Sequence, residues 1–421
     1  MTRLTPAERL VARSIELTWA FYLIGALYIV GPALGWILGA MALVALYFGP
    51  ALRPDLRPVA PVPPVVWGWA GCVAGMLVAL WIGHVDWGLG TKQTIKSTIG
   101  WAKGWSLMFL FPLAGAVLPI HRAPIVRAYC VVGAVTLALL PLFLIAPYIG
   151  LPQQILVSPL KVVGGPGPEY FTVYLYTLDP GTWAPRWQFF LPWSPFAGLI
   201  GVVTVLFARE EACVRWRRIG YAAGLAMILM SKSRMSLAAL PICLLLPSAV
   251  PLLARTWAWL ALAAASSAFA IVGGSILSWV QDGITAFRNA RADSTRVRDT
   301  LQRIAYDRWW TEARIFGHGV VERGPHLVEY MPIGSHHSWY GLLFVKGLLG
   351  AVALAVPLAI TFIFLLVKAQ SERLARTGLG LTVTLVLYSF AENLEILAYL
   401  YWPALVMIGI ALKPASEKAG S

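Results

Sequence analysis

Long apolar segments recur along the whole chain, and they restrict the fold more than any other feature. The hydrocarbon core of a bilayer is about 30 Å thick, so a helix needs roughly 20 residues to cross it. Of the 421 residues, 59% are hydrophobic and only 12% are charged, and the mean hydropathy is +0.72. Soluble domains carry about 25% charged residues. The composition therefore predicts an integral membrane protein.

The spacing of the apolar segments predicts an all-α polytopic membrane protein with about 12 transmembrane helices. The expected helices run over residues 17–30, 32–47, 65–83, 100–119, 127–148, 192–207, 219–230, 235–249, 257–279, 337–367, 378–390 and 397–412. A membrane barrel would instead show strands that alternate polar and apolar residues, and no such alternation occurs. Arginines precede the first segment and no small-residue cleavage site follows them, so a retained helix is expected instead of a removed signal peptide.

Lysine and arginine in the short loops predict the orientation. If the N-terminus is cytoplasmic, every second loop is basic and the C-terminus is also cytoplasmic. The chain then divides into three regions. Residues 1–281 contain helices 1 to 9 and an extramembrane segment at about 150–191. Residues 282–336 form a polar segment between helices 9 and 10, and residues 337–421 contain helices 10 to 12 and a cytoplasmic tail. Long translocated loops escape the charge rule, so the arginine-rich segment 282–336 is expected on the outer side.

Several classes of function are disfavoured by composition. The net charge is +14, but the basic residues are scattered over many short loops, so no nucleic-acid partner is expected. The four cysteines lie in or beside apolar segments, which indicates neither a disulfide framework nor a zinc site. No other metal motif and no nucleotide-binding glycine loop is present. We therefore expect no metal and no cofactor.

The polar segment 282–336 divides in two by composition. Arginines and apolar residues alternate at near-helical spacing over residues 287–310, which predicts an amphipathic helix at the membrane surface. Glycines and prolines over residues 315–335 predict irregular structure. The other outward segment, residues 150–193, is rich in glycine, proline and aromatic residues and is expected to fold as a lid or lateral gate.

Arginines on the outward side are candidate anion ligands, because a guanidinium matches phosphate oxygens in pairs. The candidates are Arg234, in a tight outward turn, and Arg288, Arg291 and Arg296. The alternative is that such arginines pair with acidic residues of the same segment or with lipid headgroups.

His336 and His337 are candidate bases because they stand where an apolar helix is expected to begin. The positive end of the helix dipole disfavours an imidazolium, and a neutral imidazole can accept a proton from a hydroxyl. The same helix end attracts phosphate. The alternative is a simple anchor at the membrane interface.

The stretch Ser335-His336-His337-Ser338-Trp339-Tyr340, followed by Gly347-Leu348-Leu349-Gly350, resembles the superfamily of O-antigen ligases and O-antigen polymerases of bacterial envelopes. That family carries His-Asn and a later Gly-x-x-Gly inside a membrane helix. Ser233-Arg234 is similar to its Ser-Arg turn, and residues 293–296 with Phe316-Gly317-His318-Gly319 resemble its arginine and Gly-x-Gly. The family's Asn is His337 here, so both histidines are candidates, and the spacing to Gly347 favours His336.

The resemblance implies an O-antigen ligase of the bacterial inner membrane with a periplasmic active site. Such an enzyme moves O-antigen glycan from undecaprenyl pyrophosphate to a sugar hydroxyl of lipid A-core, with inversion, and the implied partners are these two substrates and membrane lipids. The histidine would act as base and the arginines as a pyrophosphate clamp, without a metal. The alternatives are an O-antigen polymerase, a protein O-glycosyltransferase and a lipid-linked glycan flippase or transporter. A transporter needs ionisable residues deep in its helices, where this chain has almost none.

Overall fold

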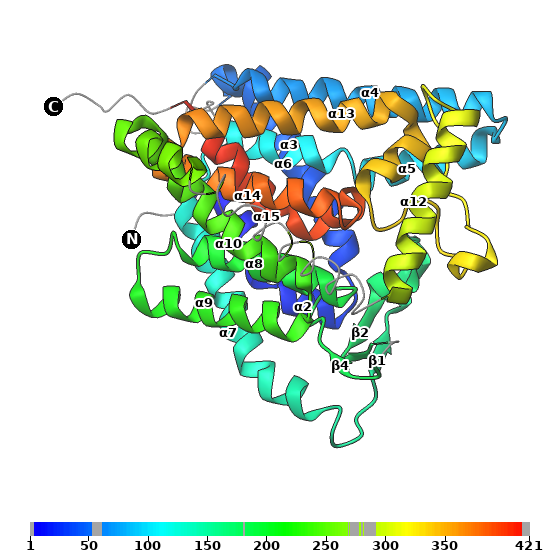
Figure 1. The fold of residues 1–421 in the computed structure, drawn as a ribbon, viewed down its shortest axis with the longest axis horizontal. Helices are drawn as coiled ribbons and strands as arrows, with labels where there is room; N and C mark the ends of the chain where they lie inside the picture. The colour runs from blue at the N-terminus through cyan, green and yellow to red at the C-terminus, as the bar shows by residue number, and fades with distance from the viewer. Residues whose placement is uncertain are drawn as a thin grey trace.

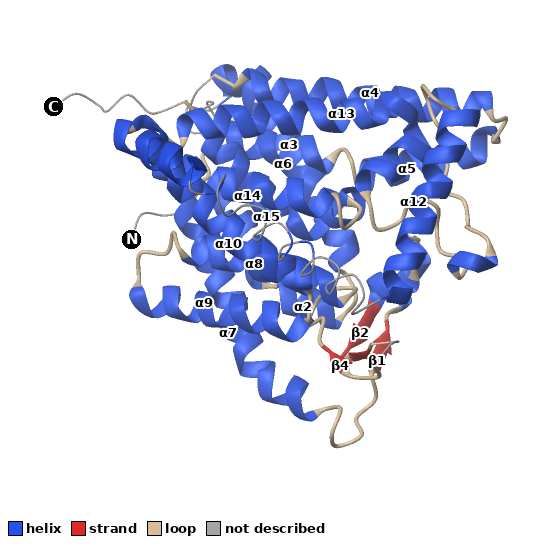
Figure 2. Ribbon diagram, in the orientation of Figure 1, coloured by secondary structure: helices blue, strands red, loops and turns tan. Residues whose placement is uncertain are grey.

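The computed structural model describes residues 4–52, 61–179, 182–267 and 292–414, with the single positions 269, 278 and 281. The chain is mostly helical, as the sequence predicts (Figures 1 and 2). The α-helices are α1 (Pro6–Glu16), α2 (Thr18–Leu23), α3 (Leu27–Leu52), α4 (Pro64–Asp86), α5 (Gly90–Lys103), α6 (Leu107–Val117), α7 (Arg122–Ile145), α8 (Ser194–Ala208), α9 (Val214–Ser231), α10 (Arg234–Ala249), α12 (Ala292–Glu312), α13 (Ser338–Lys368), α14 (Arg373–Ser389) and α15 (Leu394–Leu412). The strands are β1 (Gln154–Val157), β2 (Thr172–Tyr174), β3 (Thr177–Leu178) and β4 (Pro185–Arg186), and the short 3-10 helices are η2 (Pro159–Val163), η3 (Pro168–Phe171), η4 (Val250–Ala254) and η5 (His326–Val328).

Six helices in the described part of the chain are long and apolar enough to cross a bilayer. They are α3, α4, α7, α10 continued through η4, α13 and α15. The all-α membrane-protein class is therefore confirmed, whereas twelve crossings remain a prediction. Of the helix expected over 257–279, residues 256–267 are helical and most of the remainder lies outside the described residues.

Two expected helices are divided differently in the structure. The segment 17–30 is not one helix, because the chain turns at Gly25, which has φ 67°, and α3 then runs without interruption past Pro32. Glycine adopts this left-handed conformation without a Cβ clash. The segment 100–119 is split into α5 and α6 at Gly104. Because α5 is polar and has no buried residue, only the apolar part of that segment, α6, lies in the core.

The core of the bundle is built around α15. Every residue from Leu397 to Leu412 is buried, and the helix packs against α6, α14 and α3 (Figure 1). A helix that is apolar on all sides is stable only when it is enclosed. Along one side, α4 and α13 lie next to each other, and the indole of Trp69 donates to Thr361 Oγ1 at 3.0 Å.

The basic loops meet at one end of the bundle, which we call the α1 end. It comprises the start of α1 and the α6–α7, α8–α9 and α13–α14 connections. The buried carboxylate of Glu210 accepts from Arg122 at 3.1 Å and from Arg373 at 3.3 Å, and Glu211 pairs with Arg127 at 2.7 Å. These contacts join loops that the charge pattern assigns to one side. That this side is cytoplasmic remains a prediction.

The opposite end, which we call the α12 end, comprises α5, α12, β1 to β4, residues 313–337 and the α14–α15 turn at 390–393 (Figure 1). β1 pairs with β2 and β3 with β4, both antiparallel. Tyr22 and Ser158 connect the first pair to the bundle, since Tyr22 bonds the backbone of Tyr174 and Ser158 Oγ donates to the carbonyl of Ile24. The segment 150–191 is therefore folded onto the helices, and both its outward location and its role as a gate remain predictions.

Candidate functional site at the α12 end

The helix α13 is broken near its beginning. Gly347 has φ 63° and ψ −162°, so the backbone groups on either side lose their helical partners. Residues 314–319 replace those partners. The N–H groups of Leu348 and Leu349 donate to the carbonyls of residues 314 and 315 at 2.8 and 3.1 Å, and the carbonyls of residues 344 and 345 accept from the N–H groups of residues 318 and 319 at 2.8 and 2.9 Å.

This exchange gives both glycine motifs a structural role. Irregular backbone at membrane depth is tolerated only where its polar groups are satisfied by protein or line a polar cavity. The Gly-x-Gly loop, Gly317-His318-Gly319, enters the break that Gly347 creates. Residues 314–319 then supply hydrogen-bond partners for the backbone groups on either side of the break. The irregular structure expected over 315–335 is confirmed, with η5 and one isolated bridge between Arg323 and Pro332 as its regular features.

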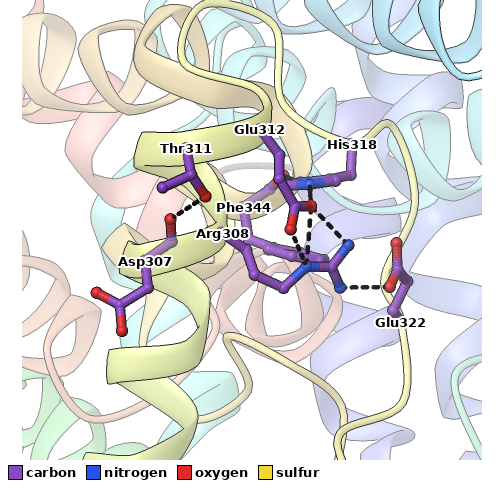
Figure 3. Close-up of polar contacts among 7 residues, drawn as sticks. All are labelled: Asp307, Arg308, Thr311, Glu312, His318, Glu322 and Phe344. Carbon is purple, nitrogen blue, oxygen red and sulfur yellow. Dashed lines mark hydrogen bonds and ion pairs between the residues drawn. The ribbon is translucent and has the colours of Figure 1, made fainter.

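A charged cluster ties this loop to α12 (Figure 3). Arg308 binds Glu312 at 2.8 Å and also Glu322, while His318 bridges Glu312 Oε2 at 2.8 Å and the carbonyl of Phe344 at 2.9 Å. The hydrogen bonds of Arg308 lower the pKa of Glu312, and those of Glu312 raise the pKa of Arg308. Arg308 therefore pairs with acidic residues of the same segment, which is the alternative role that the sequence analysis gives for such arginines.

The amphipathic helix expected over 287–310 is α12, which begins at Ala292 in the structure. Its buried stripe consists of Val297, Leu301, Ala305 and Trp309. Arg296 lies on the exposed face, and its guanidinium forms no hydrogen bond or ion pair within the described residues. Arg288 and Arg291 lie outside the described residues.

His337 is the N-cap of α13. Its side chain accepts from the N–H of Tyr340 at 3.4 Å and packs against the rings of Tyr340 and Phe390. Burial lowers the pKa of His337 to about 4, so the ring is neutral at pH 7. Asn is among the best N-cap residues, so Asn at position 337 would keep a side-chain cap.

His336 differs from its neighbour in exposure and in backbone. Its side chain is 31% exposed, and its Nδ1 lies 3.9 Å from Oε2 of Glu392, whose side chain is 4% exposed. His336 has φ 61°, a left-handed conformation that costs free energy in a non-glycine residue. Such conformations gather at functional sites. Of the two candidate histidines, His336 is therefore the more exposed one.

Ser338 fixes the distance between His336 and Glu392. Its buried Oγ donates to the carbonyl of Glu392 at 2.8 Å and accepts from the N–H of Leu394 at 2.9 Å. The α14–α15 turn is thereby held against the beginning of α13. The motif Ser335-His336-His337-Ser338 thus combines an open imidazole, a helix cap and a residue that positions the neighbouring turn.

The helix that begins at Arg234, α10, contacts the end of α14 through Ser236. Arg234 begins α10, and two residues later Ser236 Oγ accepts from Tyr388 Oη at 2.9 Å. The carbonyl of Tyr388 in turn accepts from the N–H of Glu392 at 2.8 Å. The first turn of α10 and His336 therefore both contact residues between Tyr388 and Glu392, at the end of α14 and in the turn that follows it.

Arg186 is a cation of this end that the sequence analysis missed. It lies in β4, with Nη1 3.4 Å from Asp179 and Nη2 3.2 Å from the carbonyl of Ser231, which ends α9 just before Arg234. The signal was present, because Arg186 is the only arginine between Arg127 and Arg209. The glycine, proline and aromatic residues around it are typical of a lid, and this composition does not indicate an anion site.

Buried polar atoms without a protein partner also gather here. Within the described chain, they are Trp105 Nε1, Gln188 Nε2, Trp193 Nε1 and Ser335 Oγ. All four belong to connections at the α12 end. Buried polar groups are normally hydrogen-bonded, so this end offers more donors than the protein itself satisfies. No three His, Cys, Asp or Glu side chains of the described residues are arranged to hold a metal ion.

The chain matches no protein-family model, and no curated protein matches it.

Proposed function

We propose that the protein is a glycosyltransferase that moves O-antigen glycan from undecaprenyl pyrophosphate to a sugar hydroxyl of lipid A-core at the periplasmic face of the bacterial inner membrane. The observation that carries the proposal is the position of His336 just before α13. Its imidazole is partly exposed and lies beside the buried carboxylate of Glu392. The motif resemblance supplies the substrate class, and the geometry supports the reaction type.

In the reaction, His336 accepts a proton. Its Nδ1 faces Glu392, which orients the ring, so Nε2 is the nitrogen left for the acceptor hydroxyl. The hydroxyl oxygen bonds to the anomeric carbon as the bond from that carbon to the pyrophosphate oxygen breaks, and the hydroxyl proton passes to Nε2. Attack from the opposite face inverts the anomeric centre. At 3.9 Å the His336–Glu392 pair is not hydrogen-bonded, and such contacts commonly tighten when substrate binds.

The leaving group needs positive charge more than it needs an acid, because a pyrophosphate is a stable anion. Arg234 and Arg186 lie near the α9–α10 turn, and we assign them the role of supplying that charge. Arg288, Arg291 and Arg296 would join them only if their segment approaches the donor.

The main alternative is an O-antigen polymerase, which uses the same donor chemistry and a carrier-linked acceptor. A flippase would need a polar path across the bilayer. The grouping of His336, Glu392 and Arg234 at one end favours an enzyme that acts from one side.

The first test uses purified protein with undecaprenyl-pyrophosphate-linked glycan and lipid A-core. His336→Ala should lower the transfer rate by about 100-fold or more, the range of a general base. His337→Asn, which keeps a side-chain cap, should retain most of the rate. Full activity of the His336→Ala protein would remove His336 from the mechanism.

The second test separates ligase from polymerase in a strain that lacks the protein. Loss of a ligase leaves bare lipid A-core on a lipopolysaccharide gel and carrier-linked glycan accumulates. Loss of a polymerase leaves core that bears a single repeat. A wild-type gel pattern would refute both assignments.

A further inference from the structure

Lys346 is a buried cation without an anionic partner among the described residues. It lies in the first part of α13 and is 3% exposed. No hydrogen bond or ion pair joins its Nζ to any described residue, and its nearest aromatic neighbour is Trp105, whose ring centroid lies 5.9 Å from Nζ. Burying an unpaired ammonium costs several kcal/mol. Ionisable residues within membrane helices therefore usually mark functional sites.

The helix is shaped around this side chain. The break at Gly347 follows Lys346 immediately, and a Cβ at Gly350 would lie 2.4 Å from the Cβ of Lys346. A larger residue at 350 would displace the lysine. The Gly-x-x-Gly spacing therefore interrupts the helix and also leaves the space that the Lys346 side chain occupies.

Trp105 adds a second unsatisfied donor. It is 1% exposed, and its Nε1 has no hydrogen-bond partner within the described residues. Lysine and tryptophan side chains donate but cannot accept. A separation of 5.9 Å is at the limit of a cation–π contact, so the ring offsets little of the desolvation of Lys346. Glu395 packs on Gly104 next to Trp105, yet it forms no ion pair with Lys346. Both donors lack an acceptor oxygen.

The depth of Lys346 indicates which anion supplies that oxygen. The loop that enters the break also contacts the last turn of α4, since a Cβ at Gly83 would lie 3.1 Å from the carbonyl of Gly317. α4 is a membrane-crossing helix that ends at Asp86. The break that follows Lys346 therefore lies beside the last turn of α4, near one end of its apolar span. Lipid phosphates are expected near this level of a bilayer. A phosphate offers both the charge and the acceptor oxygens.

We propose that Lys346 and Trp105 form a phosphate-binding pair for the diphosphate of the polyprenyl carrier lipid. Lys346 balances the charge of one phosphate, and the indole N–H of Trp105 donates to an oxygen of the same group. The identity of the lipid rests on the proposed function. The pair is separate from the arginines at the α9–α10 turn and adds a cation from α13.

The proposal is tested by lipid binding to the full chain in phosphatidylcholine nanodiscs. Undecaprenyl pyrophosphate, undecaprenyl phosphate and phosphatidylglycerol are titrated separately. Lys346→Met should raise the Kd for undecaprenyl pyrophosphate by about ten-fold or more, as expected for the loss of a charge-assisted contact. Trp105→Phe, which keeps a ring and removes the N–H, should raise it by about three-fold or more. Lys96→Met removes an exposed lysine of α5 and should leave the Kd unchanged.

An unchanged Kd in Lys346→Met would overturn the proposal. Equal weakening of undecaprenyl pyrophosphate and phosphatidylglycerol would also overturn it, because the site would then serve ordinary lipid headgroups. If Lys346→Met does not fold, Trp105→Phe decides, since that variant keeps the lysine. Binding requires no transfer, so tight binding through Lys346 without glycan transfer would refute the proposed function alone. Normal transfer with an unchanged Kd in Lys346→Met would refute this inference alone.

Discussion

His336 Nδ1 lies 3.9 Å from Oε2 of Glu392, and the two residues come from different helix connections. Ser338 holds these connections together through two hydrogen bonds to the α14–α15 turn. The carboxylate beside the imidazole is thus brought there by the tertiary fold and not by the local sequence. A carboxylate beside Nδ1 selects the tautomer in which Nε2 can accept a proton.

Glu392→Gln should lower kcat for glycan transfer by about 10- to 100-fold, the usual cost of losing the partner that orients a histidine. The amide keeps the shape of the side chain but loses the charge that stabilises the imidazolium formed during transfer. The KM for the lipid donor should change little. Steady-state kinetics on the purified protein measure both constants, and a higher KM with an unchanged kcat would assign Glu392 to binding.

Acid should destabilise the protein through His337. Burial lowers the pKa of His337 to about 4 from an ordinary value near 6.5, so the unfolded chain binds the proton first. The stabilisation is fully present above about pH 6.5 and is lost as the pH falls towards 4, with a limit of about 3 kcal/mol. Thermal unfolding at pH 7.5 and pH 4.5 should show the corresponding fall in Tm.

His337→Asn is the matched control for this pH dependence. Asn keeps a side-chain acceptor for the N-cap but does not titrate. Its Tm should fall less than that of the wild-type protein between the two pH values. An equal fall in both proteins would assign the acid sensitivity to another group.

The Arg308–Glu312 pair should contribute a small and measurable coupling. A double-mutant cycle of Arg308→Met and Glu312→Gln should give about 0.5–1 kcal/mol, because the pair is partly exposed. Each residue also has a second contact, Glu322 for Arg308 and His318 for Glu312, so only the cycle, and not the single substitutions, isolates this pair. A cycle of Glu312→Gln with Arg303→Met, an exposed arginine of α12, should give no coupling. Equal coupling in both cycles would indicate a general charge effect.

The sequence predicts those features of the site that are local. The apolar run after His337 predicts α13 because helix formation depends on residues a few positions apart, and the structure begins that helix at Ser338. Glu392 could not be placed in the same way, since its contact with His336 depends on how α14 and α15 pack. The turn at Gly25 was missed because Gly31-Pro32 gave a stronger breaking signal than a lone glycine.

Lys346 is a feature of the sequence whose importance is visible only in the structure. A single lysine inside an apolar run is costly, but the run as a whole satisfies the criterion for a membrane helix. The sequence therefore predicts helix interiors that are almost uncharged. Only the positions of Gly347, Gly350 and Trp105 in the structure show that the fold accommodates this lysine as a distinct feature.

Gly347→Ala should destabilise the protein and impair the site. The residue has φ 63°, and a Cβ there would lie 2.2 Å from the carbonyl oxygen of Ile315, which is backbone and cannot rotate away. Strain of this kind costs about 1–3 kcal/mol, and the displaced loop adds the loss of its hydrogen bonds to the break. Gly75→Ala in α4 is the matched control, because no atom lies within 4 Å of its Cβ position. It should be neutral or gain about 0.5–1 kcal/mol from its helical position. Thermal unfolding compares the two variants, and equal stability would mean that the break in α13 does not depend on the left-handed conformation of Gly347.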